Sequence, residues 1–215
     1  MPSILVTLGD SWPQGAELAP GEQPFGYFVQ KELQCTIWVN LGEGGTSNEH
    51  LILQLKNFVI TNVHSPVTAI FFLTNPARSI YWKGDMFYPS GNSEMQRQFL
   101  HFHDQDQLRT AITVAALQRI CLTHQIDDYY VAGWVSMSNW LPGTDVEKIY
   151  GAGAVTAAQM LNATDHNGEH LLDVGDNLYI KPNFCHPNQK GHRLIADKLS
   201  EWIKYRQQGV KNGVQ

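Results

Sequence analysis

The chain has 215 residues, of which 43% are hydrophobic and 11% aromatic, which is enough for one well-packed domain and short for two. Its net charge of -5 arises from few charged residues, 16% of the total, without blocks of either sign. That composition argues against electrostatic binding of nucleic acid and favours a small, neutral ligand as the partner. Three distant cysteines, Cys35, Cys121 and Cys185, fit neither a disulfide framework nor a zinc site, so we expect reduced thiols.

The start of the chain lacks the basic segment and the long apolar run of a signal peptide. No stretch approaches the roughly 20 apolar residues that span a bilayer. We therefore expect a cytoplasmic protein without membrane insertion, although association with a virion stays open. The sequence predicts no oligomeric state.

Apolar runs of strand length alternate with longer helical patterns along the chain, which predicts βαβ units and a mostly parallel, five-stranded sheet in an α/β fold. We expect a single domain over residues 1–206 and a frayed tail over 207–215. The expected strands lie at about 3–8, 35–40, 67–73, 128–133 and, more weakly, 170–174, and the expected helices at about 24–33, 47–63, 94–125 and 188–207.

The residues that could carry chemistry follow the predicted strands. Gly9-Asp10-Ser11 comes directly after the apolar run 4–8, a glycine-rich segment with Gly45 follows the second strand, and Asn75 follows the third. His186-Pro187-Asn188 precedes the last, amphipathic helix. Each motif alone could be an ordinary turn. Together they would meet at the carboxyl edge of a parallel sheet, where open α/β folds bind ligands.

Ser11 and His186 are candidates for a nucleophile and its base. A serine hydroxyl is a poor nucleophile near neutral pH, so Ser11 needs a base within roughly 2.6–3.2 Å, and His186 is the candidate. The negative charge that then develops on a carbonyl oxygen needs hydrogen-bond donors. The backbone N–H groups of Ser11 and Gly45 and the side-chain amide of Asn75 could supply them. Asp10 is expected to hold the turn.

These motifs resemble the four blocks of the GDSL, or SGNH, hydrolases. Residues 9–11 match the first block, 40–46 the second and 186–192 the last, while 73–76 match the third loosely. The resemblance implies a three-layer, flavodoxin-like α/β/α sandwich. It further implies hydrolysis of an oxygen ester through an acyl-enzyme, without metal or organic cofactor. The resemblance also suggests that the substrate is a short acyl or acetyl ester, such as one on a carbohydrate. Segments 9–12, 17–18 and 45–48 also resemble a microbial and phage-associated branch of the family.

One position departs from the family pattern. Where the family has an aspartate three residues before the histidine, this chain has Asn183. In a serine protease triad that exchange costs about 10⁴ in turnover. Three explanations stay open: Asp173 or Asp176 supplies a carboxylate, a backbone carbonyl orients His186, or the protein is a weak enzyme or none.

Two further side chains are candidates for substrate binding. Trp12, next to Ser11, could wall a pocket, and Arg78, just beyond Asn75, could bind a carboxylate or sugar. The alternative to a hydrolase is a carbohydrate- or virion-associated binding module that keeps the fold but turns over poorly, which Asn183 motivates.

Overall fold

The computed structural model describes residues 3–61, 65–76, 80–83, 86–89, 103–133, 140–150 and 186–212. A five-stranded, all-parallel sheet has the order β2-β1-β3-β6-β7. This is the flavodoxin-like order, in which the chain switches direction between β1 and β3. The strands are β1 (Ile4–Leu8), β2 (Ile37–Asn40), β3 (Val67–Leu73), β6 (Ile126–Ala132) and β7 (Ile149–Tyr150). The predicted α/β class and five-stranded sheet are therefore confirmed.

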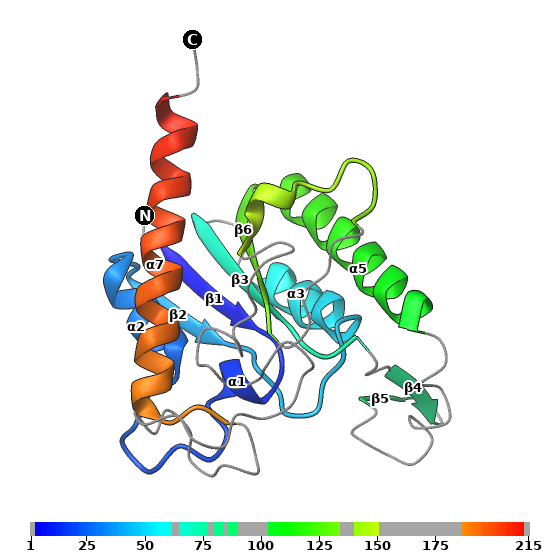
Figure 1. Cartoon of the computed structure of the whole chain (residues 1–215), viewed down its shortest axis with the longest axis horizontal. Helices are drawn as coiled ribbons and strands as arrows, with labels where there is room; N and C mark the ends of the chain where they lie inside the picture. Colours follow the sequence, from blue (N-terminus) through cyan, green and yellow to red (C-terminus); the bar gives the residue numbers. More distant parts are fainter. Residues whose placement is uncertain are drawn as a thin grey trace.

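Helices cover both faces of the sheet, as Figure 1 shows. One short helix, α1, follows β1 directly, and a 3-10 turn, η1, precedes β7. The bounds are α1 (Ser11–Gln14), α2 (Phe25–Glu32), α3 (His50–Thr61), α5 (His103–Thr123), η1 (Val146–Lys148) and α7 (Gln189–Asn212).

The alternation of side chains along β1 divides the core into two layers. Leu5 points to the face where Phe25 of α2 and Leu199 of α7 are buried. Val6 points to the opposite face, against Leu55 of α3. Because the central strands are covered on both sides, β1 and β3 are apolar almost without interruption, whereas β6 carries Asp127 and Asp128 before its apolar residues 129–132.

The structure differs from the sequence-based prediction in several elements. The predicted strand at 170–174 and the predicted helical residues 94–102 lie outside the described residues. Within the described residues, the fifth strand of the sheet is β7, which has two residues and was not predicted. A small antiparallel hairpin of β4 (Ile80–Lys83) and β5 (Met86–Pro89) was not predicted.

Helix α7 continues to Asn212, through residues 207–212, where the sequence predicts a frayed tail. Side chains near its end reach back to the domain: Gln207 Nε2 donates to Asp127 Oδ2 at 3.1 Å, and Arg206 forms an ion pair with Glu147. These contacts hold α7 to the domain as far as Gln207. Within the part of the chain that the structure describes, no helix has the length and apolarity that crossing a membrane requires.

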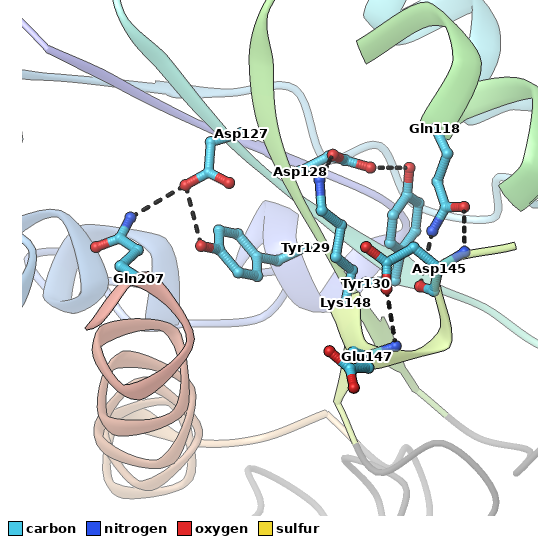
Figure 2. A network of polar contacts seen from close by, with 9 residues as sticks. All are labelled: Gln118, Asp127, Asp128, Tyr129, Tyr130, Asp145, Glu147, Lys148 and Gln207. Atoms are coloured by element: carbon cyan, nitrogen blue, oxygen red, sulfur yellow. Dashed lines mark hydrogen bonds and ion pairs between the residues drawn. The ribbon is translucent and has the colours of Figure 1, made fainter. Parts of the chain in front are cut away.

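A polar network joins β6 to the segment around η1 (Figure 2). Asp128, which is 2% exposed, accepts hydrogen bonds from Tyr130 Oη at 2.8 Å and from Lys148 Nζ at 2.5 Å. Burial lowers the pKa of Lys148, but the hydrogen bond and charge of Asp128 outweigh that effect and leave the pKa raised. The pair therefore holds η1 and β7 at the edge of the sheet as an ionised contact.

Candidate active site

Ser11 is the first residue of α1, directly after the end of β1. Gly9 makes the turn with φ +145°, and a Cβ there would lie 2.8 Å from the Cβ of Phe72, so no other residue fits. Asp10 is fully buried, and its carboxylate accepts the Trp12 N–H at 3.1 Å and thereby caps α1. The geometry agrees with the structural role expected of Asp10.

Hydrogen bonds from the neighbouring loop and from α3 also fix the backbone N–H and carbonyl of Gly9. Gln54 accepts the Gly9 N–H at 3.1 Å and donates back to its carbonyl at 3.3 Å. The Thr46 hydroxyl donates to the same carbonyl at 3.1 Å. The turn that presents Ser11 is therefore fixed by two segments besides its own strand.

His186 lies against Ser11, although 175 residues separate them in the sequence. The imidazole Nε2 is 2.9 Å from Ser11 Oγ. The following residues begin α7: the Asn188 side chain accepts the Gly191 N–H at 3.1 Å and caps the helix. The structure thus brings the first and last sequence motifs into hydrogen-bond distance of each other.

The second loop passes beside Ser11. A Cβ on Gly44 would lie 3.8 Å from the Cβ of Ser11, and the Gly44 N–H donates to Gln14 Oε1 at 3.0 Å. Gly45 has a left-handed φ of +80° with open space around its α-carbon. Among the hydrogen bonds that the described residues form, none uses the N–H of Ser11 or of Gly45.

Asn75 follows a residue that is tied to the Ser11 turn. Thr74 donates from its hydroxyl to Asp10 Oδ2 at 2.6 Å, and its N–H donates to Asn48 Oδ1 at 2.8 Å. The Asn48 amide in turn donates to the Thr74 carbonyl at 3.2 Å. These bonds hold the end of β3 beside the end of β1, with the Asn75 side chain exposed.

Of the other predicted site residues, the structure describes only Trp12. Trp12 is fully buried, with its ring centroid 5.4 Å from that of Phe72, so it packs in the core and does not line a substrate pocket. Trp12 is part of the apolar core layer that α2 and α7 cover. Arg78, Asn183, Asp173 and Asp176 lie outside the described residues.

The sequence analysis assigned no role to Glu17, which the structure places beside the histidine. Its Oε2 is 3.4 Å from Nδ1 of His186, on the side of the ring away from Ser11. Glu17 lies in a turn after α1. In the sequence it entered only the resemblance of segment 17–18 to one branch of the family, which predicts neither a role for it nor a contact with His186.

A second histidine, His192, lies on α7, six residues after His186. It is fully buried and accepts the Phe25 N–H on Nδ1 at 3.2 Å. Burial, helped by the charge of His186, lowers its pKa to about 3, so His192 is neutral at ordinary pH. It supports α7 rather than exchanging protons in the site.

A cavity of about 480 Å³ lies elsewhere, between α5 and the segment 142–148. Its lining includes Asp128 and Lys148, which bind each other, and Asp145, which accepts from the Gln118 amide at 3.0 Å. Because these polar groups satisfy one another, we do not assign the cavity to a ligand.

The sequence matches no protein-family model and no curated protein. Solved structures match over nearly the whole chain. One is a G-D-S-L family lipolytic protein from Desulfitobacterium hafniense, at 12% identity and a TM-score of 0.53, covering 93% of this chain and 98% of that one.

Two others are esterases. A catalytic mutant, aspartate to alanine, of an acetylxylan esterase from Geobacillus stearothermophilus matches at 16% identity and a TM-score of 0.50, covering 94% of this chain and 95% of that one. The esterase EstA from Pseudoalteromonas sp., inhibited by monoethylphosphonate, matches at 15% identity and the same TM-score, covering 97% and 100%. At such identities the likeness establishes the fold, and the predicted GDSL hydrolase fold is confirmed.

Proposed function

Because the chain has the fold of the GDSL hydrolases, we propose that it is a serine hydrolase that cleaves an oxygen ester through an acyl-enzyme on Ser11. The observation that carries this proposal is the 2.9 Å contact between His186 Nε2 and Ser11 Oγ. That distance lies within the range that a general base needs to take the serine proton.

The reaction follows from the two groups. Ser11 Oγ attacks the ester carbonyl carbon while its proton passes to His186 Nε2, giving a tetrahedral intermediate. When the ester C–O bond breaks, the departing alcohol takes that proton. Water then attacks the acyl-enzyme, giving its proton to Nε2, and the carboxylic acid leaves as Ser11 regains a proton. No step requires an oxidant, a reductant or a metal.

The oxyanion of the intermediate would bind to N–H donors at the sheet edge. The N–H groups of Ser11 and Gly45 make no hydrogen bond with the described residues, and we assign them to this role together with the Asn75 amide. Their positions are set by the fold before the substrate arrives, which makes such donors effective in stabilising developing charge.

We further propose a short acyl substrate, such as an acetyl ester on a carbohydrate. The acetylxylan esterase among the structural neighbours supports this choice. The test compares p-nitrophenyl acetate with the butyrate and octanoate esters and with acetylated xylo-oligosaccharides. The proposal expects kcat/KM to be highest for acetyl and to fall with chain length.

A fluorophosphonate probe tests the nucleophile. The wild-type protein should be labelled, Ser11→Ala should not, and Ser65→Ala, which changes a serine in the turn before β3, should be labelled like the wild type. Labelling that does not depend on Ser11, with p-nitrophenyl acetate turned over no faster than by Ser11→Ala, would reject the hydrolase. It would favour the binding module instead.

A further inference from the structure

We propose that Glu17 is the carboxylate that positions His186, in the role that the family gives to the residue at position 183. The inference rests on the proposed function, because a positioning residue matters only if His186 acts as a base. It names a residue from the first loop of the fold, six positions after the nucleophile, as the third member of the site.

The His186 ring contacts Ser11 through one of its nitrogens and Glu17 through the other. His186 faces Ser11 Oγ with Nε2 at 2.9 Å and Glu17 Oε2 with Nδ1 at 3.4 Å. Nδ1 is buried and makes no hydrogen bond with the residues that the structure describes. A separation of 3.4 Å is an ion-pair contact rather than a formed hydrogen bond, and catalytic hydrogen bonds often shorten only when substrate binds.

The backbone of Glu17 supports a functional role. The turn from Gly15 to Leu18 is closed by a hydrogen bond from the Leu18 N–H to the Gly15 carbonyl, and Glu17 is its third residue, with φ +66°. Glycine or asparagine usually occupies that position, because an L side chain is strained there. Strained residues concentrate at functional sites. The turn alone gives no reason for a glutamate.

Glu17 and Ser11 are also joined through the backbone. The Gly15 and Ala16 N–H groups both donate to the Ser11 carbonyl, at 3.1 and 3.0 Å. The loop that carries the carboxylate is therefore fixed to the residue that carries the nucleophile. This arrangement keeps the spacing between Ser11 and Glu17 constant while His186 lies between them.

The charges around His186 suit the same role. When Nε2 takes the serine proton, the ring becomes positive, and a carboxylate at Nδ1 stabilises that charge and keeps the Nδ1–H in place. The Glu17 side chain is 34% exposed, so the effect is smaller than in a fully buried triad. His192, whose pKa burial lowers to about 3, is neutral and adds no competing charge.

The experiment replaces the carboxylate while keeping the turn. Glu17→Gln removes the charge, Glu17→Asp keeps it on a shorter side chain, and Glu17→Gly removes the side chain at a φ that glycine prefers. Glu22→Gln is the matched control, since Glu22 lies in the same segment and a glutamine oxygen can still accept the Ala19 N–H. Acylation is followed with p-nitrophenyl acetate and with a fluorophosphonate.

With Glu17→Gln, kcat and the labelling rate should fall about 10- to 100-fold, less than the roughly 10⁴ of a buried triad, with KM nearly unchanged. Glu17→Asp should recover part of the loss, Glu22→Gln should match the wild type, and added formate should restore activity to Glu17→Gly. If Glu17→Gln stays within about twofold of the wild type while Ser11→Ala is inactive, Glu17 has no such role and the hydrolase proposal stands.

A readout independent of turnover is the ring ¹⁵N chemical shift of His186, which reports the tautomer. The wild type should carry its proton on Nδ1, and Glu17→Gly should show a mixture of the two tautomers. An identical tautomer in both proteins would overturn the inference. Loss of Ser11-dependent labelling in the wild type would instead overturn the proposed function.

Discussion

At the scale of single residues, Asn75 is the side chain that we propose to hold the oxyanion beside Ser11. Asn75 is exposed at the end of β3, and Thr74 before it is bonded to Asp10. If its amide donates to the oxyanion, Asn75→Ala should lower kcat about 10²-fold with little change in KM, since one such donor typically contributes 10²–10³. Steady-state kinetics measure this, with Asn57→Ala on the exposed side of α3 as control. An unchanged kcat for Asn75→Ala would remove Asn75 from the site.

Substitution of Gly45 can distinguish the effect of backbone strain on stability from an effect on catalysis. Gly45 and Gly21 both have left-handed φ values, +80° and +92°, with open space around the α-carbon. Alanine at either position should therefore cost about 1 kcal/mol of unfolding free energy from backbone strain alone. Only Gly45→Ala should also lower kcat, because its N–H would move. Chemical denaturation and kinetics on the two variants test this, and equal kcat values would show that the Gly45 N–H is not used.

The two ends of the site could be predicted from sequence, whereas its third contact could not. Gly9-Asp10-Ser11 and His186-Pro187-Asn188 are contiguous motifs that adjoin a strand and a helix, so their placement follows from local pattern. Glu17 comes close to His186 only because a one-turn helix ends at Gly15 and the chain folds back. Trp12 was misjudged for a related reason: its neighbour in the sequence faces the site, while its own ring turns into the core.

At the scale of the elements, the ion pair between Lys148 and the buried Asp128 holds η1 and β7 at the edge of the sheet. Lys148→Met would leave the buried Asp128 carboxylate with the Tyr130 hydroxyl but without its cation. Because Lys148 is 31% exposed, we expect a loss of about 2 kcal/mol, below the 3–5 typical of a fully buried pair.

Arg193→Met is the comparison variant, since Arg193 is 46% exposed and its ion pairs with Glu32 and Asp197 lie at the surface. It should lose less than about 1 kcal/mol. Urea denaturation measures both. Neither Asp128 nor Lys148 hydrogen-bonds to Ser11 or His186 in the described part of the chain, so kcat should stay unchanged. Equal losses for the two variants would show that burial does not strengthen the Lys148 pair.

Elements were predictable where they are long and apolar. β1, β3 and β6 are buried on both faces, and the amphipathic face of α7 is unambiguous, so hydrophobic pattern located all four. β7 has two residues, too few for any period to show. It joins the sheet through the parallel pairing with Tyr130 and Val131, supported by the Lys148 contact, which is a tertiary interaction.

At the scale of the whole molecule, the site exists only when α7 is docked. His186 lies three residues before the first residue of this helix, while Ser11 belongs to the first turn of the fold. α7 packs against α2 across the sheet face, and Figure 1 shows the two side by side. His192 joins them, accepting the Phe25 N–H at the start of α2 and stacking on its ring at 6.2 Å. Docking of α7 therefore depends on the protonation of a buried histidine.

The sign of that dependence follows from the pKa of His192, which burial lowers from 6.5 to about 3. Below pH 6.5 the unfolded chain binds a proton at this position, and the folded protein does not. The stability that neutral His192 contributes is thus complete above pH 6.5 and is lost as the pH falls from there toward about 3. One proton contributes about 1.4 kcal/mol per pH unit, or about 2 kcal/mol between pH 7 and pH 5.

His192→Asn isolates this contribution, because an asparagine oxygen can accept the Phe25 N–H in place of Nδ1 and does not titrate. The variant loses ring packing at every pH, so it should be less stable than the wild type at pH 7. The difference in unfolding free energy between the two should then shrink by about 2 kcal/mol at pH 5, measured by urea denaturation at both pH values. A constant difference would mean that His192 is protonated in the folded protein, and acid sensitivity of α7 would have to come from other groups.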